Sequence, residues 1–69
     1  MKFKDGEYAV YGINEKGTKS KVGSFTIEDN NILKSSTDII PEGEINSRVA
    51  NILNRYINDH HGYIHVEKV

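Results

Sequence analysis

The stretch INSRVANILNRYI, residues 45–57, decides how this chain folds, because it holds the strongest periodic pattern in the sequence. Its apolar side chains are Ile45, Val49, Ile52, Leu53, Tyr56 and Ile57. At about 100° per residue they fall within an arc of roughly 140°, the pattern of a helix that packs one face on a sheet. The spacing predicts a helix over about residues 43–60. Its expected flanking signals are Glu42 and Glu44 at the positive end, His60 and His61 at the negative end, and Gly62 as the stop.

The residues before this helix predict three antiparallel strands. Residues 7–13 are rich in β-forming side chains, and residues 14–17 match a type I turn closed by a left-handed glycine. A returning strand is expected over 19–28, and Asp29 and Asn30 signal a second turn into a strand over 31–35. Alternation after the helix predicts a last strand over 63–68. The expected fold is one α+β domain over residues 1–69, of order β-β-β-α-β. Its four-stranded, mainly antiparallel sheet carries one amphipathic helix on one face.

The turn at residues 14–17 also predicts which side chains share a face of the sheet. If Gly17 closes this turn so that Asn14 faces Thr18, one apolar set shares a face and is the expected core: Ala9, Tyr11, Ile13, Gly23, Phe25, Ile27 and Ile32. The other face is expected to stay uncovered by the helix, and its members are Tyr8, Val10, Val22, Ser24, Thr26, Tyr63 and His65.

Composition limits what the chain can be. With 69 residues there is room for one small core, and the absence of cysteine excludes disulfides and cysteine-based zinc fingers. A net charge of -1 argues against a protein that coats a polyanion. The polar first residues and the lack of a long apolar run predict a cytoplasmic protein with no export signal and no membrane segment.

Two surfaces are expected to bind a partner. On the uncovered sheet face, Tyr8 and Tyr63 are the aromatic anchors, accompanied by Val10, Val22 and His65. On the helix, a polar stripe recurs at intervals of three and four residues and consists of Arg48, Asn51, Arg55 and Asn58, of which the first three are the expected contact residues. The leading hypothesis is a small non-enzymatic protein-binding module, a regulatory or inhibitory accessory protein that binds another protein or pairs as a homodimer. Its size and composition are typical of accessory proteins from bacterial or mobile-element genomes.

Other functions have weaker support in the sequence. A nucleic-acid-binding domain would use the sheet aromatics or Arg48 and Arg55, but two arginines on a slightly acidic domain give few phosphate contacts. A metal-binding domain would use His60, His61 and His65, yet their spacing matches no familiar ligand pattern. No nucleophile elbow, phosphate loop or dinucleotide motif is present, so neither an enzyme nor a cofactor is expected.

The segment Asp38-Ile39-Ile40-Pro41 has two interpretations. Its isoleucines either close the core beside the helix start as a hydrophobic staple, or form an exposed docking loop in an acidic setting. The staple is the commoner arrangement.

Overall fold

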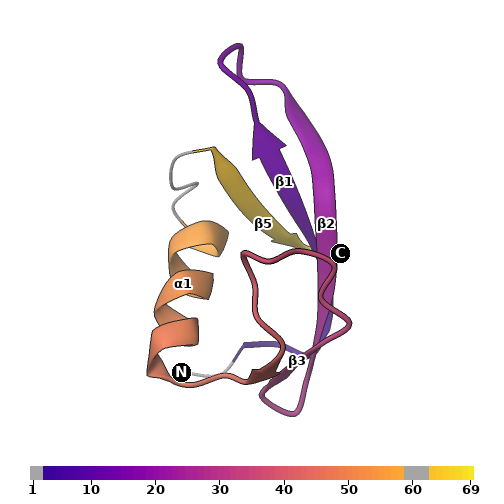
Figure 1. The fold of residues 1–69 in the computed structure, drawn as a ribbon, viewed down its shortest axis with the longest axis vertical. Coiled ribbons are helices and arrows are strands. Elements are labelled where there is room, and N and C mark those ends of the chain that lie inside the picture. The colour runs from indigo at the N-terminus through magenta and orange to yellow at the C-terminus, as the bar shows by residue number, and fades with distance from the viewer. Residues whose placement is uncertain (1–2, 59–62) are drawn as a thin grey trace.

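The structure of the protein is a computed structural model that describes residues 3–58 and 63–69. Within these residues it has one α-helix and five β-strands. In chain order they are β1 (Gly6–Ile13), β2 (Lys19–Glu28), β3 (Asn31–Leu33), β4 (Gly43–Glu44), α1 (Ser47–Asn58) and β5 (Ile64–Lys68). The strands form one antiparallel sheet in the order β4-β3-β2-β1-β5, and α1 connects its two edge strands (Figure 1). The predicted α+β class is confirmed. The one helix that the structure describes, α1, is not long and apolar enough to cross a membrane.

The sheet has one strand more than predicted, because the helix begins later than expected. Gly43 and Glu44 are extended and pair with β3, and the φ of Gly43 is 124°, a value that favours glycine. The side chain of Asn46 caps the helix, since its Oδ1 accepts a hydrogen bond of 3.0 Å from the backbone N–H of Val49. The predicted start at residue 43 is therefore wrong. The predicted end at His60, His61 and Gly62 lies outside the described residues.

Both predicted turns are confirmed. At the first, the backbone N–H of Asn14 donates to the carbonyl of Thr18, and Gly17 is left-handed with a φ of 82°. The side-chain Oδ1 of Asn14 accepts hydrogen bonds of 2.9 Å from the backbone N–H groups of Lys16 and Thr18, which fixes the tip. At the second turn, Asp29 and Asn30 both have positive φ, as a tight hairpin between β2 and β3 requires.

A β-bulge in β2 changes the register that the first turn sets. Tyr11 lies opposite Lys21, but Val10 lies opposite Gly23, so Val22 is an extra residue with no partner on β1. From Gly23 onward, every residue of β2 is shifted by one position relative to β1, compared with the register that the turn alone would give. Tyr8 therefore lies opposite Phe25. The predicted faces are therefore wrong for β1, where Tyr8 and Val10 belong to the core face and Ala9, Tyr11 and Ile13 to the other. Phe25, Ile27 and Ile32 are in the core as predicted.

The core lies between this face of the sheet, α1 and the segment that precedes α1. Its buried members are Tyr8, Val10, Phe25, Ile27, Ile32, Ile40, Ile45, Val49, Leu53 and Val66. The rings of Tyr8 and Phe25 stack with centroids 5.2 Å apart and an interplanar angle of 2°. The Tyr8 hydroxyl donates a hydrogen bond of 2.6 Å to the Lys4 carbonyl. Burial, and to a smaller extent the charge of Asp5, raise the pKa of Tyr8.

The segment between β3 and β4 folds over the same face of the sheet. It crosses β2 at Gly23, where a Cβ atom would lie 3.1 Å from Thr37 Cβ and 3.2 Å from Ser36 Oγ. The backbone N–H of Ser36 donates to the Ser24 carbonyl, and the side-chain Oγ of Ser36 accepts from the backbone N–H of Ser24. Glycine at position 23 therefore allows a close approach that brings the segment down onto the core.

Candidate binding groove beside the helix

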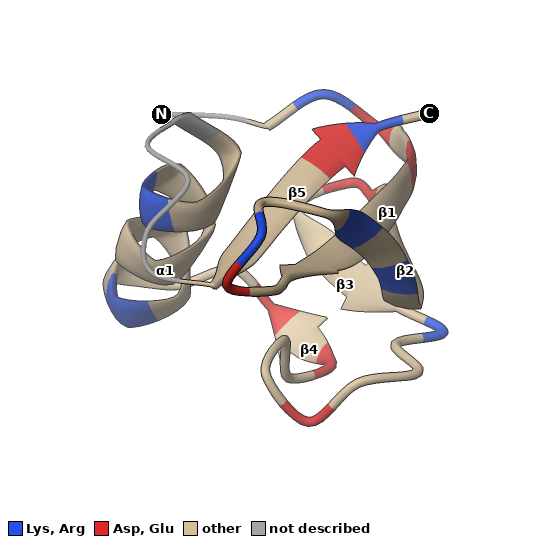
Figure 2. Cartoon of the chain, turned by 90° about the horizontal axis from the view of Figure 1, so that it is seen from above, with Lys and Arg blue, Asp and Glu red and all other residues tan. Residues whose placement is uncertain are grey.

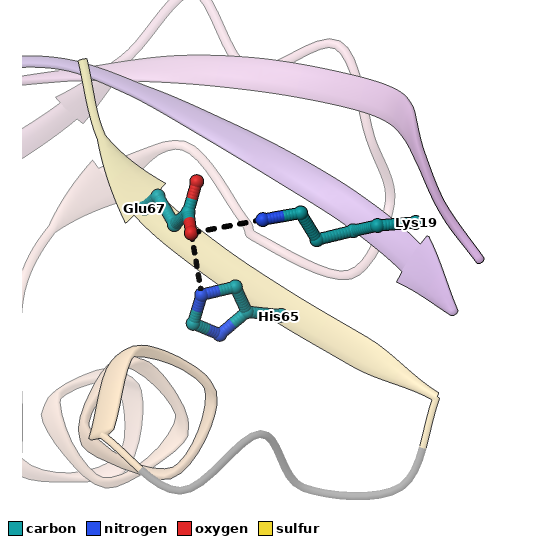
Figure 3. Close-up of polar contacts among 3 residues, drawn as sticks. All are labelled: Lys19, His65 and Glu67. Carbon is teal, nitrogen blue, oxygen red and sulfur yellow. Dashed lines mark hydrogen bonds and ion pairs between the residues drawn. The ribbon is translucent and has the colours of Figure 1, made fainter. Parts of the chain in front are cut away.

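The sheet face opposite α1, where the sequence predicts a contact surface, carries three polar side chains that contact one another. His65 and Glu67 lie on β5, two residues apart, and Lys19 reaches them from β2 (Figure 3). One carboxylate oxygen of Glu67 is 3.0 Å from Lys19 Nζ and 3.1 Å from His65 Nε2. The Lys19 ammonium also lies 4.7 Å above the centre of the Tyr11 ring. These contacts engage Lys19, His65 and Glu67 with groups of the same molecule.

The five sheet residues that are predicted to contact a partner differ in exposure: two are in the core, one is buried on the opposite face, and two are exposed. Tyr8 and Val10 are buried in the core and cannot contact a partner. His65 faces the expected side but is only 5% exposed. Val22, at the bulge, and Tyr63, just before β5, are 54% and 67% exposed. The structure therefore leaves two of the five predicted sheet residues accessible.

The Lys19 and Glu67 pair makes a direct prediction about titration. The hydrogen bonds from Lys19 and then from His65 lower the pKa of Glu67. Replacing Lys19 with methionine is expected to raise that pKa, measured by NMR titration of the Glu67 carboxyl group. Folding lowers the pKa of Glu67, so its ionised carboxylate stabilises the fold at pH values above the pKa of the unfolded state. This stabilisation is lost as the pH falls through the lower pKa of the folded state.

Lys21→Met provides the matched control for this titration. Lys21 is an exposed lysine on the same strand and makes no ion pair with the described residues. Its replacement should leave the Glu67 titration where it is. A similar rise of the Glu67 pKa in both variants would show that general positive charge, and not the contact with Lys19, is responsible.

The polar stripe of α1 is accessible as predicted. Arg48, Asn51 and Arg55 are all exposed, and they are accompanied on this side of the helix by the half-buried Ile52. Among the residues that the structure describes, neither arginine has an ion-pair partner. Figure 2 shows that α1 carries only basic charges, whereas β4 and the part of the chain just before it carry acidic ones. Two exposed guanidinium groups thus flank an apolar side chain.

A groove of about 360 Å³ opens between this part of α1 and the segment before β4. Its lining residues are Asp38, Ile39, Pro41, Arg48, Val49 and Ile52. Four of the six are apolar, and the two charged ones come from opposite walls. Val49 belongs to the core, while Ile39 and Ile52 pack against it, so the apolar surface of the groove is continuous with the interior. Such a hollow suits an apolar side chain from another molecule.

Hydrogen bonds hold the outer wall of the groove in place. The Ser35 hydroxyl donates to the carbonyl of Ile40 at 2.6 Å, and the Thr37 hydroxyl accepts from the backbone N–H of Ile39 at 3.3 Å. Ile40, next to Ile39, is 1% exposed. The wall is therefore anchored in the core, and little ordering would be needed on binding.

A smaller hollow of about 170 Å³ lies beside the turn between β2 and β3, between Phe3, Asp5, Asp29 and Asn30. One carboxylate oxygen of Asp5 accepts a hydrogen bond of 3.2 Å from the backbone N–H of Asp29. This oxygen of Asp5 is therefore already bonded to the turn between β2 and β3. Across residues 3–58 and 63–69 no three histidine or acidic side chains converge as metal ligands. His60 and His61, which the metal hypothesis requires, lie outside those residues.

The sequence pattern identified the stripe but not the groove. Arg48 and the Ile39 segment were each recognisable, but nothing in their local spacing shows that they face one another. The only available signal was the interval of four residues between Arg48 and Ile52, which places an apolar residue beside the stripe. Comparisons with protein-family models, curated proteins and solved structures gave no match for this chain.

Proposed function

We propose that this protein is a non-enzymatic protein-binding module that acts through the polar stripe of α1 and the adjoining groove. The observation that supports this proposal most directly is the position of half-buried Ile52, between two exposed arginines and at the mouth of a preformed apolar hollow. An apolar centre with arginine at its margin is the usual composition of a protein contact site.

The sheet face is the weaker candidate for the same role. Two of its predicted members, Tyr8 and Val10, are in the core, and three others of its polar side chains, Lys19, His65 and Glu67, already contact one another. A nucleic acid is also a poorer ligand for the groove, because Asp38 lines it and would repel a nearby phosphate backbone. A protein segment can instead place its carboxylates on the side of α1, away from Asp38.

Site-specific photo-crosslinking in cells that produce the protein tests this proposal. A photoreactive residue at Asn51, in the centre of the stripe, is expected to give a discrete adduct with another protein. The matched control carries the same residue at Glu15, which is exposed at the tip of the β1–β2 hairpin. We expect the adduct yield at Asn51 to exceed that at Glu15 by about tenfold, because Glu15 lies outside the proposed contact site.

A charge-reversed pair, Arg48→Glu with Arg55→Glu, should abolish the adduct at Asn51. Both side chains are exposed, so the fold should be retained, as checked by circular dichroism. Equal adducts at Asn51 and Glu15, or an adduct that survives the charge reversal, would contradict the proposed site.

A further inference from the structure

We infer that the groove and stripe bind an extended acidic segment of a partner protein, in which one apolar residue lies beside the first of two carboxylates spaced about 10 Å apart. This inference rests on the proposed function and names the chemistry of its partner. It follows from three features of the described residues: the charge of the stripe, the distance along it and the size of the groove.

The charge of the stripe favours an acidic ligand. Arg48 and Arg55 are the only charged residues of α1, both are exposed, and neither has an ion-pair partner among the described residues. A guanidinium group binds a carboxylate through two parallel hydrogen bonds, which favours a planar acidic partner over an isolated polar group. Asp38 on the facing wall keeps the ligand carboxylates on the side of α1.

The separation of the two arginines sets the spacing of the carboxylates. They are seven residues apart on a helix that rises 1.5 Å per residue, which places them about 10 Å apart along its axis. In a polyproline II segment, residues i and i+3 point to the same side and are also about 9 Å apart. An extended ligand with acidic residues three positions apart can therefore reach both arginines.

The size of the groove favours one apolar anchor. At about 360 Å³ it is at the small end of the range for ligand pockets. A docked helix usually presents three or four apolar anchors over two turns, and this needs a longer hydrophobic groove. Since Arg48 lines the groove and Arg55 does not, the apolar residue of the ligand should lie next to the carboxylate that binds Arg48.

The test is selection of a phage-displayed library of random 12-residue peptides on the whole chain. Enriched peptides are expected to share a large apolar residue and two acidic residues three positions apart. A synthetic enriched peptide should bind Arg48→Glu with Arg55→Glu at least about tenfold more weakly than the wild type. In ¹H–¹⁵N spectra it should shift the amide signals of Ile39 and Ile52.

A charge-matched control separates this site from general electrostatic attraction. Lys16→Glu with Lys21→Glu changes the net charge by the same amount, but on the exposed β1–β2 hairpin. Peptide binding should change less than about twofold in this variant at 0.15 M salt, where the Debye length is about 8 Å. A peptide with lysines in place of its acidic residues should bind the charge-reversed α1 variant better than it binds the wild type.

The possible failures are distinguishable. Enriched peptides that lack paired acidic residues but still shift Ile39 and Ile52 would overturn the inferred chemistry and leave the proposed site standing. No enrichment, or enriched peptides that leave both residues unshifted, would count against both. Tighter binding of a thymidine 20-mer than of any selected peptide, lost on reversal of Arg48 and Arg55, would replace the acidic segment with a nucleic acid.

Discussion

Replacing Tyr8 with serine is expected to lower the free energy of unfolding by about 3 to 5 kcal/mol, the range for removing a large aromatic side chain from a core. Tyr8 is 4% exposed, its ring stacks on Phe25, and its hydroxyl bonds the Lys4 carbonyl. Domains have about 0.05 to 0.15 kcal/mol of stability per residue, so this loss removes much of the total for a chain of this size. Urea denaturation followed by circular dichroism measures it.

Tyr63→Ser is the matched control for this substitution. Tyr63 is 67% exposed, and its replacement should change the free energy of unfolding by less than about 0.5 kcal/mol. The comparison tests the bulge at Val22, because without it Tyr8 would face Ser24 on the uncovered side of the sheet. Similar small effects at both tyrosines, with no nuclear Overhauser contact between the rings of Tyr8 and Phe25, would disprove the bulged register.

The elements that the sequence predicts correctly are those determined by neighbouring residues. The turn at Asn14 and Gly17 needs one left-handed glycine and one side-chain acceptor within five residues, and both are visible in the sequence. The apolar face of α1 follows from the helical period alone. In such cases local chemistry is sufficient, and the structure matches it.

The bulge at Val22 could not be predicted from neighbouring residues, because it depends on which side chains of β1 and β2 are buried together and not on the turn at Asn14 and Gly17. An uninterrupted register would separate Tyr8 and Val10 from Phe25 and Ile27, whereas the bulged register places these four side chains on one face. Burying them together removes more apolar surface from water than the alternative with Ala9 and Gly23. Comparing the bulk of the two alternating sets of β1 and β2 would have favoured this arrangement.

The groove was not predictable for a similar reason. Its helical wall follows from the periodicity of α1, but its outer wall depends on where a segment between β3 and β4 crosses the sheet. That position is set by the close approach at Gly23 and by the burial of Ile40, which are contacts between distant parts of the chain. The sequence showed the two isoleucines before Pro41 without separating their roles.

The structure assigns different roles to these two isoleucines, and a pair of substitutions tests the difference. Ile40→Ala is expected to lower the free energy of unfolding by about 2 to 5 kcal/mol, because Ile40 is 1% exposed and belongs to the core. Ile39→Ala should cost about 1 kcal/mol, since a half-buried side chain loses only part of its transfer free energy. Urea denaturation of both variants gives the comparison.

Binding should follow the opposite order in protein that remains folded. Ile39 lines the groove and Ile40 does not, so Ile39→Ala should weaken the selected peptide although the domain stays folded. Ile40→Ala, studied well below its melting temperature, should keep the peptide affinity of whatever fraction is folded. An equal loss of stability in the two variants would mean that Ile39 also serves as a core staple. The groove would then have a wall that cannot be altered without unfolding the domain, and its binding role would have to be tested through Arg48 and Ile52 instead.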